Sequence, residues 1–194
     1  MTEQAMLEKL RDMIDAKRFA HSIGVRDTAV MLARQYGVDA EKASIAGLLH
    51  DCAKNIPKEE SIRRCEEAGI PLKPVCYIEK GLVHSYLGAI VAKEEFGIMD
   101  EEILSAIFYH TTGHEDMPML TKIVYLSDIL EPGRNVPNLE ELRKIAMDDI
   151  DEALIRAINS TICHILQKGS VLDCDTVMAR NFLVQEKRQM ALPI

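Results

Sequence analysis

The chain has 194 residues, which is enough to bury one substantial core, and no stretch of it resembles a linker, so we expect a single domain over residues 1–194. Its 23 Lys and Arg residues against 31 Asp and Glu residues give a net charge of −8, which disfavours nucleic acid or an anionic membrane as a partner. The five cysteines include no CxxC pair and fit neither a zinc knuckle nor a disulfide framework, so we expect reduced thiols in a cytoplasmic protein.

Helical periodicity dominates the chain. No segment approaches the roughly 20 consecutive apolar residues of a membrane span, and sustained period-two alternation is absent. The pattern predicts an all-α bundle of about nine or ten helices. In the amino-terminal half, Asp39 is placed to cap a helix that runs into His50, and Asp100 is placed to cap the helix that leads to His110.

The carboxy-terminal third shows the clearest helix, over residues 150–168. Its apolar residues form one stripe, and Gly169 suits the position just beyond the helix end. Before it, Asn138 is followed three residues later by Glu141, which predicts a capping box at the start of another helix. We expect these last helices to complete the bundle.

Several ionisable residues occupy positions that helical patterning would give to Leu or Ile. His21, for example, shares a helix face with Val25, Ala29 and Leu32, so its imidazole is expected to point inward. Asp128 lies inside an apolar run, where a lone ionised carboxylate costs several kcal/mol unless it is paired or bound to metal. The full set is His21, His50, Asp51, His84, His110 and Asp128.

Two explanations are open for such residues. A single inward histidine is most often a hydrogen-bonded core residue, whereas six inward ionisable groups need a common cause, and a shared metal site supplies one. Imidazole and carboxylate donors without a thiolate cluster suit Fe, Mn, Co or Zn better than Ca. His114, in a loop rich in Gly and Pro, and His164, off the apolar stripe of its helix, are excluded from the site.

The order of these residues resembles the HD-domain phosphohydrolase superfamily. The pattern consists of His21, the His50-Asp51 doublet and Asp128, and His84 and His110 extend it to the two-metal form. The segments 50–54 (HDCAK), 110–113 (HTTG) and 127–134 (SDILEPGR) are similar, more closely, to the YqeK family of bacterial symmetrical diadenosine tetraphosphatases. The matching part of the chain runs from about residue 18 to residue 134.

The resemblance implies a metal-dependent hydrolase that cleaves diadenosine tetraphosphate into two ADP with a metal-activated water. It also implies one or two divalent transition-metal ions, iron being the most expected and Mn, Co or Zn the alternatives. Two other functions stay open: another HD-type hydrolase, acting on a nucleoside mono- or triphosphate or on a signalling nucleotide, and a nucleotide-binding regulator without turnover. A homodimer is also left open.

The resemblance suggests how two ions would share the ligands. One ion would be held by His21, His50, Asp51 and Asp128, and the other by His84 and His110 with Asp51 as a bridge. A water activated between two such ions is a strong nucleophile at neutral pH. Asp51 is therefore expected to serve catalysis directly.

Basic and hydroxyl side chains near the motifs are candidates for contact with phosphate. Lys54 lies one helical turn after His50, Arg18 precedes His21 by three residues, and Arg134 follows Asp128 in a loop. We expect Lys54 to act in both catalysis and substrate binding, and Arg18 and Arg134 in binding. Residues 111–113 (Thr111, Thr112 and Gly113) either donate to a phosphate or end their helix.

Overall fold

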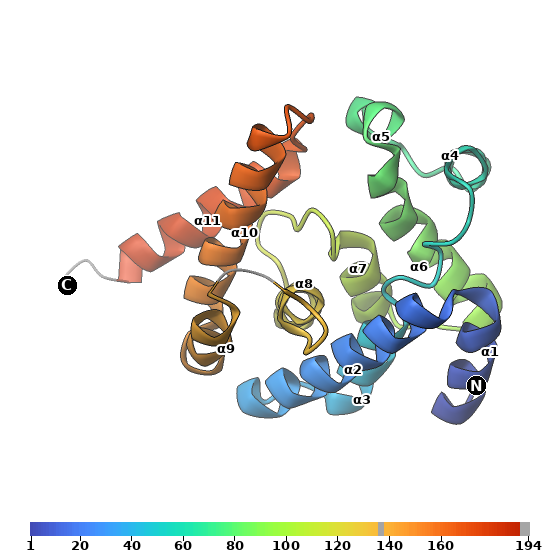
Figure 1. Cartoon of the computed structure of the whole chain (residues 1–194), viewed down its shortest axis with the longest axis horizontal. Coiled ribbons are helices and arrows are strands. Elements are labelled where there is room, and N and C mark those ends of the chain that lie inside the picture. Colours follow the sequence, from blue (N-terminus) through green and yellow to red (C-terminus); the bar gives the residue numbers. More distant parts are fainter. Residues whose placement is uncertain (136–137, 191–194) are drawn as a thin grey trace.

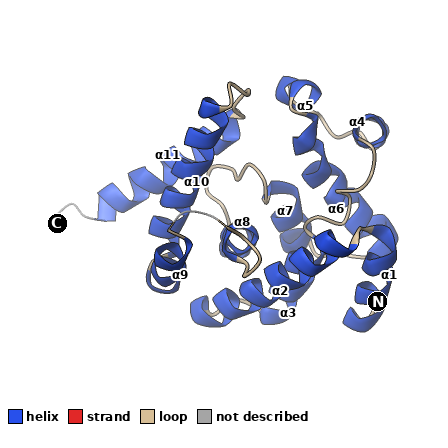
Figure 2. Cartoon of the chain, viewed as in Figure 1, coloured by secondary structure: helices blue, strands red, loops and turns tan. Residues whose placement is uncertain are grey.

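The computed structural model describes residues 1–135 and 138–190. Every regular element in these ranges is helical (Figure 2), so the predicted all-α fold class is confirmed. The elements labelled in Figure 1 are α1 (Glu3–Met13), α2 (Ala16–Tyr36), α3 (Ala40–Leu49), α4 (Lys58–Glu67), α5 (Pro74–Ile78), the 3-10 turn η1 (Lys80–Leu82), α6 (Val83–Phe96), α7 (Glu101–Tyr109), α8 (Met119–Leu130), α9 (Leu139–Asp148), α10 (Ile150–Gln167) and α11 (Cys174–Met190).

The number of helices is slightly larger than predicted. The described ranges contain eleven α-helices against an expected nine or ten. The five residues of α5 are too few to display a helical period in the sequence, so a helix this short escapes prediction. None of the helices in the described ranges is long and apolar enough to cross a membrane.

The predicted helix ends are confirmed at three places. The Asp39 side chain accepts hydrogen bonds from two backbone N–H groups at the start of α3, and Asp100 does the same at the start of α7. Helix α10 ends at Gln167, and Gly169 adopts the left-handed conformation, φ 65°, that glycine reaches without strain.

The predicted capping box at Asn138 is wrong. Asn138 precedes α9 as expected, but its φ of 58° places it in the left-handed region, and its side chain makes no capping hydrogen bond. A side-chain cap requires an extended residue, from which the side chain can reach back to the first free N–H groups. Glu141 forms an ion pair with Arg156 of α10 instead, at 2.9 Å.

Helix α8 is the central helix of the bundle. Its buried residues occur on all sides rather than on one stripe, which is the pattern of a helix enclosed by others. It packs against α2, α3, α7 and α10, and Figure 1 shows it end-on in the middle of the molecule. The polar side chains of Thr121 and Ser127 on α8 are therefore buried, and that of Asp128 is mostly buried.

Helices α2 and α3 approach each other closely at Gly47. A Cβ atom added at Gly47 would lie 3.0 Å from the Cα atom of Arg26 and 3.2 Å from the Cβ atom of Ala29, both in α2. The absence of a side chain at this position lets the two backbones meet. Because α2 carries His21 and His50 directly follows α3, this contact fixes the spacing of two predicted metal ligands.

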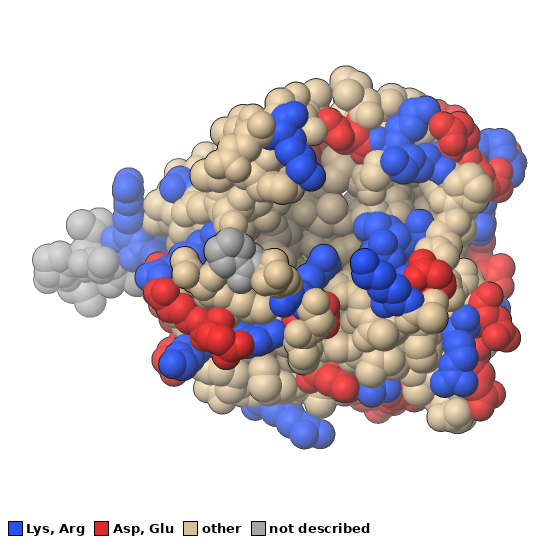
Figure 3. Space-filling model, in the orientation of Figure 1, with Lys and Arg blue, Asp and Glu red and all other residues tan. Residues whose placement is uncertain are grey.

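A hollow lies in the middle of one face of the molecule. Figure 3 shows it between α10 and α11 on one side and α5 and α6 on the other. The two sides are tied together at its edge, where Lys73 Nζ lies 3.2 Å from Asp173 Oδ1 and the Val171 N–H donates to Glu79 at 3.1 Å. The carboxy-terminal helices thus complete the wall of the hollow.

The close contact at Gly47 leads to a prediction about stability. We expect Gly47→Val to lower the free energy of unfolding by about 1–3 kcal/mol, because the added methyl groups force α2 away from α3. Urea unfolding followed by circular dichroism measures the change. Glu41→Val, at an exposed position of the same helix, controls for β-branching. Equal effects of the two substitutions would refute the packing argument.

Candidate metal centre

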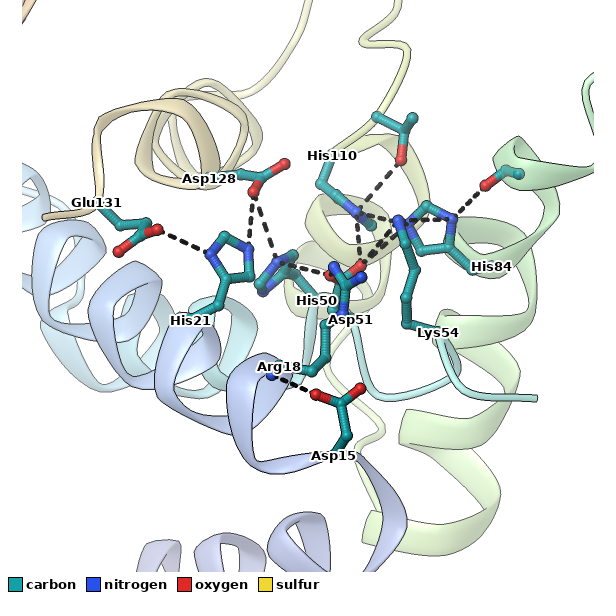
Figure 4. A network of polar contacts seen from close by, with 12 residues as sticks. Asp15, Arg18, His21, His50, Asp51, Lys54, His84, His110, Asp128 and Glu131 are labelled. Carbon is teal, nitrogen blue, oxygen red and sulfur yellow. Dashed lines mark hydrogen bonds and ion pairs between the residues drawn. The ribbon is translucent and has the colours of Figure 1, made fainter. Parts of the chain in front are cut away.

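The structure brings the six predicted ligands together. His21 comes from α2, His84 from the first turn of α6 and Asp128 from α8, while His50 and Asp51 follow α3 and His110 follows α7. Figure 4 shows their side chains pointing toward one another. Three groups have potential ligand atoms within 4.8 Å of one another: His21, His50 and Asp51; His50, His110 and Asp128; and Asp51, His84 and His110.

Three of the four histidines are oriented by the same kind of local hydrogen bond. The Nδ1 atom of each donates to the backbone carbonyl three residues earlier. Because His50 and His110 stand at the ends of α3 and α7, these carbonyls belong to the last helical turn, where the usual helical partner is missing. The distances are 2.8 Å from His50 to Gly47 O, 2.6 Å from His84 to Gly81 O, and 2.7 Å from His110 to Ile107 O.

His21 is oriented by a carboxylate instead. Its Nδ1 atom donates to Glu131 Oε1 at 3.1 Å, and Glu131 also accepts the N–H of Gly133 at 2.6 Å. Gly24 makes room for this carboxylate, because a Cβ atom there would lie 2.6 Å from Glu131 Oε2. The sequence analysis does not single out Glu131. The available signal was a glycine one turn after His21 and a carboxylate one turn after Asp128.

His50, His84 and His110 therefore direct an unprotonated Nε2 atom toward the centre, and the Nε2 atom of His21 lies 2.9 Å from Asp128 Oδ1. The Nε2 atoms of His84 and His110 lie 3.1 Å apart, and that of His84 lies 3.0 Å from Asp51 Oδ1. The buried Nε2 atom of His50 has no hydrogen-bond partner. Lone pairs that face one another and face carboxylate oxygens repel unless a cation lies between them. The donor set fits a divalent transition metal.

The protonation states of these side chains also favour metal binding. Burial lowers the pKa of His50 and the pKa of His84, each to about 4, so both are neutral ligands at pH 7. Burial by itself would raise the pKa of Asp51, but the pKa lies well below its usual range. The guanidinium group of Arg18, which donates to Asp51 Oδ2 at 2.9 Å, favours the ionised carboxylate. Burial also opposes a charge on His21, but its hydrogen bonds to Asp128 and Glu131 raise its pKa. At neutral pH the centre thus combines the neutral imidazoles of His50 and His84 with ionised carboxylates, which attract a cation.

The predicted division of ligands between two ions is matched only partly by the geometry. Asp51, His84 and His110 form one group, as expected for the second ion, and His21, His50 and Asp51 form most of the set for the first ion. The remaining group joins His50 and Asp128 to His110 and so crosses the predicted division. The assignment of individual ligands to each ion stays a prediction.

Three cations lie against the carboxylates of the centre. Arg18 donates to Asp51 Oδ2 at 2.9 Å, Lys54 Nζ lies 3.5 Å from Asp51 Oδ1, and Arg134 donates to Asp128. Their side chains are 33%, 30% and 40% exposed respectively, so they also face the solvent. Burial lowers the pKa of Lys54 despite the nearby Asp51. These cations form the rim of the centre, where an anion would first be met.

The turn after His110 offers one hydroxyl group to the centre. Thr111 Oγ1 lies 3.2 Å from His110 Nε2 and is partly exposed. Thr112 is buried and donates to the carbonyl of Gly113 at 3.0 Å, and Gly113 adopts a left-handed conformation with φ 65°. The placement of Thr112 and Gly113 favours helix termination, while Thr111 retains the geometry of a substrate contact.

The fold and the centre together define a class of protein. Residues 18–133 match the HD domain family, and the chain belongs to that family. The match begins at Arg18 and ends just before Arg134.

Individual relatives narrow the comparison. The symmetrical bis(5′-nucleosyl)-tetraphosphatase of Bacillus subtilis (strain 168) is 36% identical over 95% of this chain and 98% of its own length. A protein of the same name from Halalkalibacterium halodurans is 35% identical over 97% of this chain and 100% of its own. A crystal structure from Clostridium acetobutylicum, described as a predicted HD superfamily hydrolase involved in NAD metabolism, has a TM-score of 0.93 at 42% identity, covering 96% of this chain and 98% of that one. The resemblance to the YqeK family is confirmed.

The position of Glu131 predicts an effect on metal affinity. We expect Glu131→Leu to weaken metal binding by about 10–100-fold, because His21 loses the acceptor that holds its Nδ1 proton and ring orientation. Glu131→Gln, whose amide oxygen can still accept this proton, should lose less. Competition with a chromogenic chelator measures both affinities. If the two variants bind metal as tightly as the parent, Glu131 does not orient His21.

The buried neutral histidines predict a pH dependence of stability. Between pH 6.5 and about 4 the unfolded chain binds protons that His50 and His84 cannot accept in the fold, so the free energy of unfolding of chelator-treated protein should fall as pH falls. Each histidine contributes up to about 1.4 kcal/mol per pH unit.

Urea unfolding at several pH values measures this slope. His50→Gln should flatten it, whereas His164→Gln, at an exposed position of α10, should not. A parent slope that His50→Gln leaves unchanged would contradict the assignment to the buried centre.

Proposed function

We propose that this protein hydrolyses diadenosine tetraphosphate symmetrically into two ADP with the help of bound divalent metal. The observation that carries the proposal is the convergence of four imidazole Nε2 atoms and two carboxylates beneath a rim of three cations. The names of the relatives that align over nearly the whole chain support the choice of substrate.

The metal ions, when bound, would supply an activated water and a Lewis acid for the phosphoryl group. His21, His50, Asp51, His84, His110 and Asp128 are the residues that would hold them. The tautomers set by the Nδ1 hydrogen bonds keep the Nε2 lone pairs available for this purpose, and Asp51 lies near ligand atoms of both predicted sets. No residue is assigned as a general acid, since ADP is a tolerable leaving group when its phosphate charge is neutralised.

The rim supplies the remaining electrostatic stabilisation. Arg18, Lys54 and Arg134 approach the centre from its solvent side, where their charges can contact the phosphoryl oxygens of a bound polyphosphate. Guanidinium groups bind phosphate in a bidentate manner, which fixes its orientation as well as its charge. Lys54 lies 2.9 Å from His84 Nε2 and is the cation placed deepest, so it is the rim residue assigned to catalysis.

The proposal also covers the resident metal, the extent of the domain and the compartment. Iron is proposed as the resident metal, with Mn, Co and Zn as alternatives, because the nitrogen and oxygen donors suit any of these ions. The domain is proposed to span residues 1–194, with a homodimer open. All five cysteines are free thiols, which supports the cytoplasm as its compartment.

The competing proposal is a different nucleotide hydrolase of the HD class. The structural relative from Clostridium acetobutylicum is described as involved in NAD metabolism, which makes NAD⁺ a second candidate substrate. A nucleoside triphosphate or a signalling nucleotide is a third. A regulator that binds nucleotide without turnover would keep the same metal centre.

Product analysis separates these functions. We expect metal-loaded protein to convert diadenosine tetraphosphate into ADP as the sole nucleotide, and to leave NAD⁺ and ATP unchanged, when products are resolved by ion-exchange chromatography. Asp128→Asn should reduce the rate by more than about 100-fold through loss of a ligand. Asp12→Asn, the same change at an exposed site in α1, should match the parent.

Two results would overturn the proposal. The appearance of AMP and ATP would exclude symmetrical cleavage, and turnover of NAD⁺ or ATP in preference to diadenosine tetraphosphate would move the protein to another substrate class. Binding without any product would favour the regulator.

A further inference from the structure

A cavity of about 630 Å³ lies between α8, α9 and α10, apart from the metal centre. None of the six predicted metal ligands lines it. Apolar side chains form much of its wall and hydroxyl groups lie beside them: Ile129, Leu142, Ile145 and Ala157 are joined by Ser160 and Thr161. Its volume falls within the range of about 300–1,000 Å³ that is usual for small-molecule sites.

Arg134 connects this α8–α10 cavity to the metal centre. Its side chain lines the cavity, while its guanidinium group donates to the carboxylate of Asp128 and its Nε atom donates to the Asp128 carbonyl at 2.7 Å. Ile129, the residue after Asp128, also lines the cavity. A phosphate held by Arg134 at the centre would therefore leave the rest of its molecule at the mouth of the cavity.

The second arginine of the cavity has a different role. Arg156 forms ion pairs with Glu141 and Glu152, each at 2.9 Å, so its charge is already neutralised by carboxylates of the protein. Arg134 pairs instead with Asp128, a predicted ligand of the metal centre, so its charge lies beside the metals. The cavity thus presents an apolar interior with hydroxyl groups and a cation at the end nearest the metals, which matches a nucleoside followed by phosphate.

We propose that the α8–α10 cavity binds one nucleoside of the dinucleoside polyphosphate, with the adjoining phosphates crossing Arg134 to reach the metal centre. This inference rests on the proposed function and specifies how its substrate is seated. The apolar faces of a purine pack against Leu142 and Ile145, and its ribose and ring edges meet Ser160 and Thr161. The distance from this seat to the metals then determines which phosphorus is attacked.

One test compares ligands with and without a nucleoside. Ser160→Trp fills the cavity from an exposed position of α10, and Gln167→Trp places the same side chain on the same helix away from the cavity. Isothermal titration of metal-loaded protein measures the dissociation constants of ADP and of inorganic pyrophosphate. We expect Ser160→Trp to weaken ADP by at least about tenfold and to leave pyrophosphate within about twofold of the parent. Gln167→Trp should change neither.

A second variant controls for distortion of the structure by the Trp side chain of Ser160→Trp. Leu142→Ala removes part of the apolar wall without adding volume, and we expect it to weaken ADP severalfold while pyrophosphate binding persists. Parallel losses of ADP and pyrophosphate affinity would indicate a disturbed centre and overturn the assignment. So would ADP binding that neither variant changes.

The outcome for this subsite is separable from that of the proposed function. If the parent does not cleave diadenosine tetraphosphate, the proposed function fails whatever the variants bind. If the parent cleaves it to ADP but Ser160→Trp has the parent's KM for the substrate and the parent's affinity for ADP, the nucleoside seat alone is wrong. A higher KM for Ser160→Trp, at least about tenfold, with unchanged metal content supports both.

Discussion

The hydrogen bonds that fix the four Nδ1 protons are the interactions on which the rest of this site depends. His50 and His110 stand at helix ends, where a backbone carbonyl one turn back is free to accept. With that proton fixed, each imidazole has one lone pair left, and the fold directs it inward. Burial keeps His50 and His84 neutral, so the lone pairs are available at pH 7. An arrangement of converging acceptors is unfavourable by itself and becomes favourable when cations bind.

The bundle is built to hold these helix ends together. Helix α8 is enclosed by its neighbours, so Asp128 projects into the interior, and Gly47 lets α3 approach α2 until the side chains of His21 and His50 lie in one cluster. Gly24 has a similar role within the site, because the absence of a side chain at this position leaves room for Glu131. Small residues at helix contacts therefore determine the ligand geometry as much as the ligands do.

Sequence periodicity indicated the predicted metal ligands but not the residues that orient them. His21, His84 and Asp128 interrupt apolar patterns on their own helices, and His50 and His110 directly follow such patterns. This is a local signal that needs no tertiary information. The pairing of Gly24 with Glu131 depends on the distance between α2 and the end of α8, which no local pattern contains. The α8–α10 cavity likewise arises from segments far apart in the chain. The capping preference of Asn138 gave a wrong prediction, because its backbone adopts the left-handed conformation instead.

The charge distribution links the centre to the kind of substrate it admits. A protein with a net charge of −8 repels long polyanions over most of its surface. Arg18, Lys54 and Arg134 concentrate positive charge at the rim of one buried centre, so attraction acts only over a short range, within about 8–10 Å at physiological salt. A small polyphosphate fits within that range. The cations of the rim therefore attract a short anion before any contact with a base is made.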